Sequence, residues 1–345
     1  MKKIQFFLLI LFFLPACQHQ NKTPDISGIQ VDLHVERFEN DLFSIDTNSV
    51  LKGLDFLIKK YPGFSPVFFG SVLGLPDSSS ILDRELRRFI SLNRPVYETV
   101  EKKYKDLDEI KKEFEKSFRF VKYYFPDYLI PKIITLIGPA DAMAKMQNGN
   151  YSTDFLGQDF LGVSLQFYLG KDYSLYQVPY FIDNVAPLYR SRRFEKEYIV
   201  PDAMKLIVDD LFPDKSAGTP LIEQMIEKGK QWWMLDHFLP ATADSLKTGY
   251  TKAQLDWCTE NEGLIWNYLL TNENIESIDP TTIQNYIGES PTTQGMPKSS
   301  PGNIGQWVGW QIVKKFADKN SALKPAEIMN TPARTILTQA KYKPK

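Results

Sequence analysis

The chain has 345 residues, of which 43% are hydrophobic and 13% aromatic, and its formal net charge at pH 7 is −1. This apolar fraction is ample for a packed core, while so balanced a charge provides no general attraction to nucleic acid or anionic lipid. The length suits one large domain or two closely packed ones.

The first seventeen residues, MKKIQFFLLILFFLPAC, have the layout of a secretory signal. Two lysines precede an apolar run at 4–14, which is about half the ~20 residues that a transmembrane helix needs. The run ends in LPAC and resembles a bacterial lipobox, in which the cysteine is acylated. We therefore expect a lipoprotein signal peptide at 1–16, a lipid on Cys17 and a flexible tether at 17–27. Pro15 is an unusual occupant of this motif, and an ordinary cleaved signal peptide is the alternative.

Once residues 1–16 are removed, 39 Lys+Arg remain against 42 Asp+Glu. With Cys17 acylated, Cys258 is the one cysteine left, so the mature protein has no intrachain disulfide and depends on packing for its stability. No histidine lies near Cys258 in sequence, which favours a core position over a nucleophilic role.

The pattern of apolar residues predicts strands first and helices afterwards. Residues 29–38 alternate as in a half-buried strand, a helix follows Asp46 and stops at Tyr61, and a long amphipathic helix covers 97–125. Two more strands are expected at 132–137 and 161–169. Further helices are expected at 199–212, 220–238, 251–270, 280–287, 302–318 and 325–340. This order predicts an α+β fold, with a small N-terminal sheet packed against a predominantly helical half, in a single domain at 28–345.

Two helix starts carry capping signals. Thr251 with Gln254 fits a capping box, and Asp279 followed by Pro280 fits an N-cap with proline at the first helical position. The glycines at 302, 305 and 309 fall on one helical face. Because glycine costs about 1 kcal/mol in a helix relative to alanine, we interpret the row as close backbone packing rather than phosphate binding.

The histidines provide no recognisable metal motif. His19 lies in the tether, while His34 and His237 are each isolated, on a predicted strand and near the end of a predicted helix. A zinc hydrolase normally has two histidines at helical spacing plus a carboxylate, and no HExxH pair occurs. No cofactor is expected. The alternative is an envelope hydrolase with an atypical site around His34, His237 and carboxylates.

Other residue types leave alternatives open. Four aspartates flank the predicted strand at 161–169, namely Asp154, Asp159, Asp172 and Asp183, and we interpret most of them as turn formers or surface charges. Two pairs of nearby tryptophans in the helical half stand out, namely Trp232 with Trp233 and Trp307 with Trp310. Core packing is the default for them, and an aromatic-lined groove for a partner is the alternative.

Several segments together resemble a known family. The lipobox, VDLHVERFE, PDYLIPKIITLIG, FLGVSLQFYLGKDY, QVPYF and SPGNIGQWVGWQIV are similar to the gliding-motility lipoprotein GldB family of the Bacteroidota, over essentially the whole mature chain. The resemblance implies a cell-envelope lipoprotein needed for gliding in motile members. It also implies a distant similarity to gluzincin-type zinc proteases whose metal motif is lost. In that comparison the helix at 199–212 corresponds to the metal helix, and Lys228 stands where an active relative has a metal-ligating anion.

These observations predict a non-enzymatic scaffold or interaction module. It is exported and held at a membrane by the lipid on Cys17, facing the periplasm, and its partners are other envelope proteins, including gliding or secretion machinery. Nucleic acid is not an expected partner. Gln18 follows the cysteine and no acid-rich stretch comes after it, which favours the outer membrane over the inner one.

Overall fold

The computed structural model describes residues 23–76, 79–145, 151–272 and 274–344. Cys17, His19, the predicted signal peptide and the first part of the predicted tether lie outside these residues. Within the described part of the chain, no helix combines the length and apolar composition needed to cross a bilayer.

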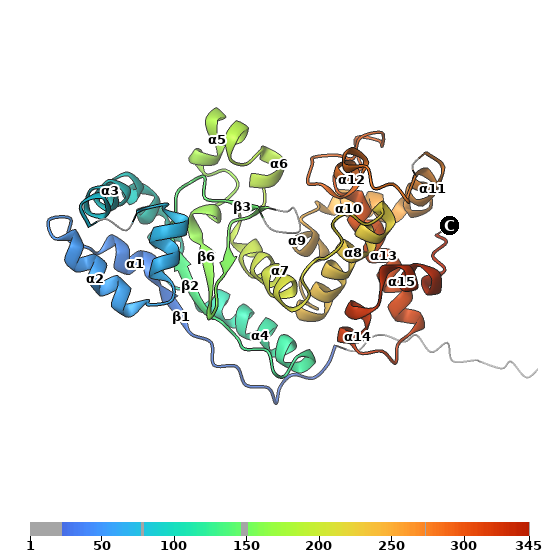
Figure 1. The fold of residues 1–345 in the computed structure, drawn as a ribbon, viewed down its shortest axis with the longest axis horizontal. Helices are drawn as coiled ribbons and strands as arrows, with labels where there is room; N and C mark the ends of the chain where they lie inside the picture. Colours follow the sequence, from blue (N-terminus) through green and yellow to red (C-terminus); the bar gives the residue numbers. More distant parts are fainter. Residues whose placement is uncertain (1–22, 77–78, 146–150, 273, 345) are drawn as a thin grey trace, which may run out of the picture.

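A four-stranded sheet is built from β1 (Val35–Arg37), β2 (Lys132–Leu136), β6 (Phe160–Ser164) and β5 (Phe155–Leu156), in this spatial order. The first three strands are parallel, and β5 runs antiparallel to β6 at the edge. A separate hairpin pairs β3 (Ala144–Lys145) with β4 (Tyr151–Ser152). Helix α1 contacts β2 while α7 contacts β5 and β6, so the sheet lies between them (Figure 1). Because helices pack on both faces of the sheet, β6 is buried along its whole length.

Both outer predicted strands are shorter than expected. Residues 29–34 are irregular and β1 keeps three residues of the predicted 29–38. The strand predicted at 161–169 ends at Ser164 and continues as a 3₁₀ turn, η2 (Leu165–Phe167). The turn forms because the backbone N–H of Tyr168 donates to the Leu165 carbonyl, while the Tyr168 hydroxyl donates to Asp154.

Helices fill the connection from β1 to β2. They are α1 (Phe38–Phe43), α2 (Val50–Lys60), the π-helical turn η1 (Val67–Val72), α3 (Ser79–Lys103) and α4 (Asp108–Tyr124). The helix predicted after Asp46 is confirmed as α2. The single helix predicted over 97–125 is wrong, because the chain breaks between α3 and α4. Arg37 donates to the Tyr104 carbonyl at 2.7 Å, and the Tyr104 hydroxyl donates to the Tyr168 carbonyl at 2.5 Å. These tertiary bonds hold Tyr104 in a buried bend.

The segment after β6 contains short elements and then the helical half. The short elements are η3 (Ser174–Gln177), α5 (Pro179–Asn184), α6 (Leu188–Ser191) and η4 (Lys196–Tyr198). The helical half comprises α7 (Ile199–Leu211), α8 (Leu221–Phe238), α9 (Asp244–Thr248), α10 (Lys252–Glu260), α11 (Glu262–Asn272), α12 (Pro280–Ile287), α13 (Ile304–Lys319), α14 (Pro325–Asn330) and α15 (Ala333–Ala340). The predicted α+β class is therefore confirmed.

Four of the six predicted helices of this half are single helices, and two are divided. The helix expected at 251–270 is interrupted at Asn261, whose backbone and side-chain N–H groups both donate to the Trp257 carbonyl. The helix expected at 325–340 is interrupted at Thr331 and Pro332. Proline has no N–H and disfavours a helical conformation in the residue before it, which explains the second break.

Both predicted caps are present. The Gln254 backbone N–H donates to the Thr251 hydroxyl at 3.1 Å, and the Thr251 N–H donates to the Gln254 side chain at 2.9 Å. Asp279 accepts from the Thr282 N–H at 2.8 Å at the start of α12. Each cap satisfies backbone donors that the first helical turn leaves unpaired.

The glycines at 302, 305 and 309 make close contacts, as the packing interpretation predicts, but not all with one helix. Gly309 lies against α8, Gly305 lies against α8 and α12, and Gly302, which precedes α13, lies against Ser290. A Cβ atom at Gly309 would lie 1.7 Å from the Met225 carbonyl oxygen, and one at Gly229 would lie 2.2 Å from the Gly309 carbonyl carbon. A Cβ at Gly305 would lie 2.8 Å from the Tyr286 oxygen. The two helix backbones therefore touch, and glycine is needed on both sides.

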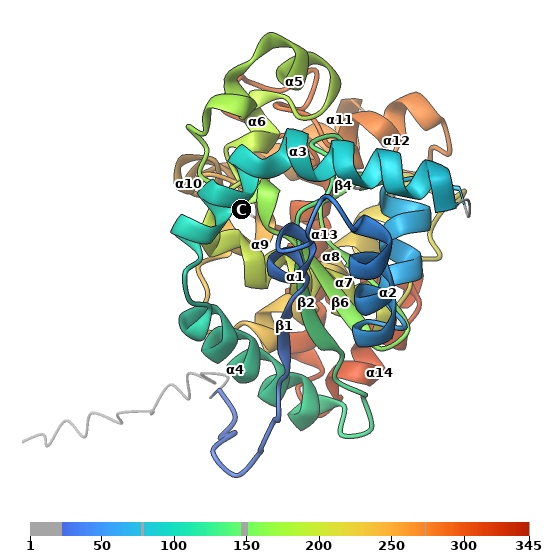
Figure 2. The ribbon, with the colours of Figure 1, turned by 90° about the vertical axis from the view of Figure 1, so that its left-hand side faces the viewer.

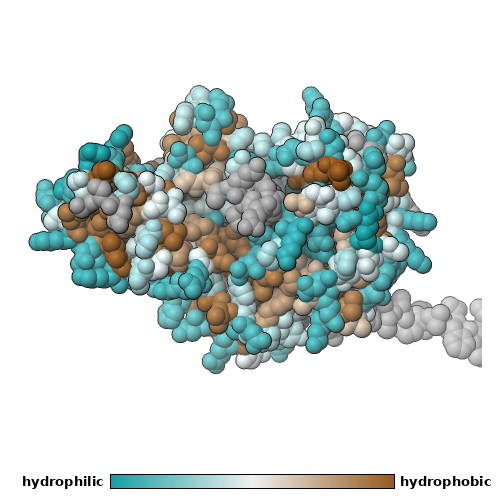
Figure 3. Space-filling model, viewed as in Figure 1, coloured by the Kyte–Doolittle hydropathy of each residue, from teal (hydrophilic) through white to brown (hydrophobic). Residues whose placement is uncertain are grey.

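One buried apolar cluster extends from Leu33 to Tyr342 and joins the sheet to the helical half. In Figure 1 α1–α3 and the sheet lie toward one end of the molecule and α8–α15 toward the other, while α4 and α7 lie between them. Figure 2 shows the same molecule from the end that carries α1–α3. Figure 3 shows a largely polar surface with apolar patches scattered over it.

Candidate functional site

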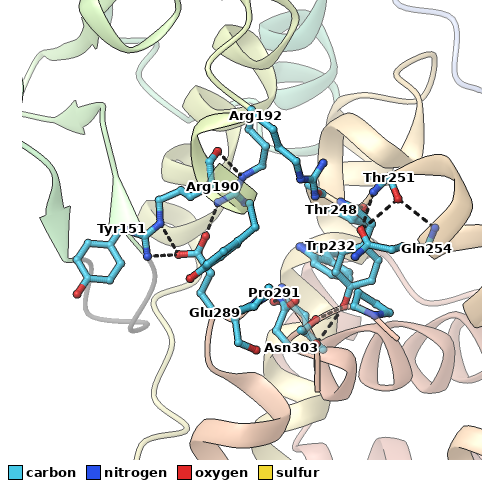
Figure 4. A pocket seen from close by; sticks show the side chains of 18 of the residues that line it. Tyr151, Arg190, Arg192, Trp232, Thr248, Thr251, Gln254, Glu289, Pro291 and Asn303 are labelled. Carbon is cyan, nitrogen blue, oxygen red and sulfur yellow. Dashed lines mark hydrogen bonds and ion pairs between the residues drawn. The ribbon is translucent and has the colours of Figure 1, made fainter. Parts of the chain in front are cut away.

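A cavity of about 690 Å³ opens between the sheet-containing end and the helical half (Figure 4). One wall comes from β4, α6 and α7. The other comes from α8, the α9–α10 region and the segment 289–306 that leads into α13. We call this cavity the central cleft.

Two arginines hold a carboxylate across the cleft. The Glu289 side chain, which follows α12, forms an ion pair with Arg190 at 2.8 Å and a second one with Arg193. The Arg190 guanidinium also lies 4.3 Å from the centroid of the Tyr151 ring. Burial by itself would raise the pKa of Glu289, but Arg193 and Arg190 outweigh it and lower the pKa below its ordinary value. Glu289 is therefore a carboxylate at neutral pH and ties the two walls together.

Arg192 makes a different contact. Its guanidinium donates to the Gly249 carbonyl at 2.5 Å, and it forms no ion pair among the described residues. Burial lowers the pKa of Arg192, which nevertheless remains a cation because arginine starts so high. Gly249 has a φ of +75°, and a Cβ there would lie 2.8 Å from Arg193. The turn after α9 thus requires glycine in order to receive these arginines.

The helical wall is formed where α13 begins. Asn303 precedes the helix with a φ of +46°, in the left-handed region. The Tyr250 hydroxyl lies 2.9 Å from the Gly302 carbonyl and 3.2 Å from that of Asn303. Gln306 donates to the Lys228 carbonyl at 3.1 Å. These bonds explain why the SPGNIGQW segment, which the sequence analysis singled out, adopts one defined shape at the cleft.

Helix α7 supplies acidic groups to the opposite wall. Asp202 pairs with Lys205 at 2.7 Å. Asp209 is half-buried, and its Oδ1 atom has no hydrogen-bond partner among the described residues. Burial, followed by the neighbouring Asp214, raises the pKa of Asp209, and Lys228 opposes this rise. Lys228 itself forms a buried ion pair with Asp214 at 2.6 Å.

A fully buried carboxylate lies directly behind the cleft wall, next to Thr153. Asp154 accepts from the Tyr168 hydroxyl at 2.6 Å and from the Ser164 N–H at 2.9 Å. Burial raises the pKa of Asp154 to about 7, although both hydrogen bonds lower it. The other flanking aspartates behave as surface charges: Asp159, Asp172 and Asp183 are exposed.

The two histidines of the described residues have separate surroundings. His34 is exposed and lies 3.5 Å from Asp32. His237 is half-buried, its Nδ1 atom lies 2.9 Å from the Trp233 carbonyl, and its ring packs on Trp233 and Tyr124. Within the described part of the chain, no three histidine, cysteine, aspartate or glutamate side chains gather closely enough to hold a metal ion.

The four tryptophans are buried, with exposed fractions of 5% (Trp232), 6% (Trp233), 2% (Trp307) and 2% (Trp310). Of these, Trp232 also lines the central cleft, so a groove formed by all four is not present. Trp232 and Trp310 pack edge to face at 5.9 Å, and the Trp310 N–H donates to Asp236. The rings of Trp232 and Trp310 are therefore buried in the contact between α8 and α13. Cys258 is buried too, which raises the pKa of its thiol to about 12.

Sequence reasoning did not find the charged residues of the cleft. Arg190 and Glu289 are separated by 99 positions, and no periodic pattern links them. The dense basic segment YRSRRF was the one available signal, and a basic run by itself does not identify its partners.

The fold and the cleft together define a protein class. It is an α+β protein in which a small mixed sheet and a helical half enclose a cavity lined by both charged and aromatic side chains, whose walls are tied by ion pairs.

Comparison with known families identifies the chain further. The family model described as gliding motility protein GldB matches residues 19–344, so the chain belongs to this family. The predicted membership in the GldB family is thereby confirmed. No curated protein and no solved structure matches the chain.

Proposed function

We propose that this protein is a lipid-anchored, non-enzymatic interaction module of the cell envelope, and that its central cleft binds a segment of another envelope protein. The family match carries the proposal, because a gliding-motility family implies work within an envelope assembly. The cleft is the natural docking place, since it is large, presents both charged and apolar side chains, and is lined by both ends of the molecule.

One cation of the cleft, Arg192, is placed to receive an acidic group of a partner. Glu289 and Asp202 are both engaged by cations of the protein itself. Arg192, by contrast, has a backbone carbonyl as its acceptor and no carboxylate among the described residues. A carboxylate of the partner would find its best available donor there, because a guanidinium can bind it through two parallel hydrogen bonds.

The lipid on Cys17 supports this role by restricting the domain to a thin layer near the bilayer. A short tether raises the effective concentration of the cleft for partners bound to the same membrane. We place the protein on the periplasmic face of the outer membrane, as the residues after Cys17 favour. Fatty-acid labelling tests the anchor: we expect label on the natural chain and none on the Cys17→Ser variant. Label retained on the variant would refute the assignment.

We further propose that the scaffold derives from a gluzincin-type peptidase that has lost its metal. Helices α7 and α8, which the sequence comparison equates with the two metal-binding helices, pack on one another. Lys228 forms its buried ion pair with Asp214 beside them, so a cation and its counter-ion occupy this region.

The alternative function is a hydrolase that uses His34, His237 or carboxylates. Metal analysis of the purified protein separates the two hypotheses. Stoichiometric zinc that disappears in a His237→Ala variant would contradict the scaffold proposal. His34→Ala is the matched control, because that side chain is exposed and lies in other surroundings.

Site-specific photo-crosslinking in intact cells tests the cleft directly. A photoreactive side chain at Tyr151, which is 45% exposed at the cleft, is expected to crosslink a defined envelope protein. The same group at Leu264, 69% exposed on α11, is the control and should not capture that protein. Equal capture at both positions, or capture at Leu264 alone, would contradict docking in the cleft.

A further inference from the structure

The loop between α4 and β2 presents an exposed leucine at one edge of the molecule. This loop, residues 125–131 with the sequence FPDYLIP, is part of a family motif that the cleft does not use. Leu129 is 86% exposed, the highest value among the exposed large apolar residues of the described chain. Tyr123, at the end of α4, is 47% exposed.

The α4–β2 loop is braced from within. The Tyr128 hydroxyl donates to Asp210 at 2.9 Å, and its N–H donates to the Phe125 carbonyl at 3.1 Å. The Phe125 ring packs edge to face on Phe212 at 5.5 Å. Leu129 is therefore held out in water by an ordered loop. A single exposed leucine is common on protein surfaces, so its meaning depends on where it lies.

Leu129 lies beside the entry of the tether. The Ile133 N–H donates to the His34 carbonyl at 2.9 Å, and β1 and β2 are parallel. Parallel neighbours enter a sheet from the same edge, so the segment before His34 and the α4–β2 loop emerge together. Figure 2 shows both segments at the lower edge of the molecule.

The length of the tether places this edge close to the lipid. Leu33 is 2% exposed and Val31 packs against the core, so the chain joins the core near Val31. From Cys17 to Val31 the chain advances fourteen residues. A flexible chain of this length has a root-mean-square span of roughly 20 Å and cannot exceed about 50 Å when fully extended.

We propose that the α4–β2 loop docks on the bilayer, with Leu129 inserted at the boundary between headgroups and acyl chains and Tyr123 at the headgroup level. The inference rests on the lipid anchor of the proposed function. An apolar side chain at ~5–10 Å depth and an aromatic one above it are typical of interfacial contacts. In Figures 1 and 2, α6 and α10 of the cleft lie at the end opposite to this loop. Docking therefore leaves the central cleft open to partners away from the membrane.

Depth-dependent fluorescence on the acylated full-length protein tests the orientation. The chain has two cysteines, of which Cys17 carries the lipid and Cys258 is 0% exposed, so a new surface cysteine can be labelled selectively. An environment-sensitive dye is placed on Leu129→Cys or, as the matched control, on Leu264→Cys. Both proteins are reconstituted in vesicles of phosphatidylethanolamine and phosphatidylglycerol, with and without lipids that carry a quencher on the acyl chain.

We expect a blue-shifted emission and quenching by lipid at position 129, and water-like, unquenched emission at position 264. Vesicle-bound protein with a water-like signal at 129 would overturn the docking proposal while leaving the anchor intact. Lipid-independent blue shifts at 129 that depend on protein concentration would instead indicate a second copy on this loop and also overturn it. Absence of acylation would count against the proposed anchor itself, so the two failures are distinguishable.

Discussion

Replacing Gly309 with alanine would place a methyl group in the contact between α8 and α13. The new Cβ atom would lie 1.7 Å from the Met225 carbonyl oxygen and 2.3 Å from its carbonyl carbon. Both neighbours are backbone atoms of a buried helix, so no side-chain rotation relieves the clash. The two helices must move apart along a large apolar interface.

The expected loss of stability follows from two opposing effects. Alanine is favoured over glycine in a helix by about 1 kcal/mol. Overpacking a dense core costs about 1–3 kcal/mol, and occasionally more. Because two helix backbones must shift here, we take a cost of about 4 kcal/mol. We therefore expect Gly309→Ala to lower the free energy of unfolding by roughly 3 kcal/mol. With an unfolding entropy of about 2.1 cal/mol/K per residue, this corresponds to a Tm decrease of about 4–5 °C.

Urea unfolding followed by circular dichroism measures this change, provided that the m-value stays constant. Gly70→Ala is the matched control, because Gly70 lies in the helical turn η1 and a Cβ there meets nothing within 4 Å. We expect the control to change stability by less than about 1 kcal/mol. A Gly309→Ala variant as stable as the natural chain would refute the backbone-contact argument.

Three further predictions concern the cleft and its surroundings. Burial raises the pKa of Asp154 to about 7, so the folded chain loses stability as pH rises from about 4 to 7. Asp154→Asn should remove up to roughly 4 kcal/mol of this pH dependence, as measured by urea titrations at a series of pH values. A variant whose unfolding free energy depends on pH as steeply as that of the natural chain would contradict the prediction. Arg193 and Arg190 lower the pKa of Glu289 below its ordinary value, so Glu289→Gln should cost about 1–3 kcal/mol at pH 7. Thermal melts should show this deficit shrinking as pH falls below the ordinary glutamate pKa of 4.5, because the carboxylate becomes protonated. A deficit that does not change with pH would show that charge is not the cause. Thr251→Ala removes a capping box and should lower the free energy of unfolding by about 1 kcal/mol in urea. Thr251→Ser keeps the cap hydroxyl and should retain most of the stability of the natural chain.

Local signals in the sequence were sufficient for several elements. The caps at Thr251 and Asp279 and the stop of α2 at Tyr61 depend on side chains and backbone groups within a few positions of one another. The glycine row at 305 and 309 predicted a close contact, since repeated glycine in a helix is unfavourable without one.

The predicted helix over 97–125 shows where such reasoning stops. Its apolar residues recur at helical spacing on both sides of the break, so the period continues while the helix does not. Arg37, more than sixty positions away, donates a hydrogen bond to the Tyr104 carbonyl, and the Tyr104 hydroxyl donates to the Tyr168 carbonyl. No window of neighbouring residues contains these partners.

The sequence by itself determined the family of this protein, through motifs shared with the GldB family, and the α+β order of its elements, and it predicts a lipid anchor at Cys17. The tertiary structure alone decided the central cleft. Glu289 and Arg190 meet only after the packing of α7–α12, the helices that separate them in the chain, has brought residues 99 positions apart to within 2.8 Å. An ion pair of this kind leaves no periodicity in the chain, because its geometry comes from the packing of the elements that carry it.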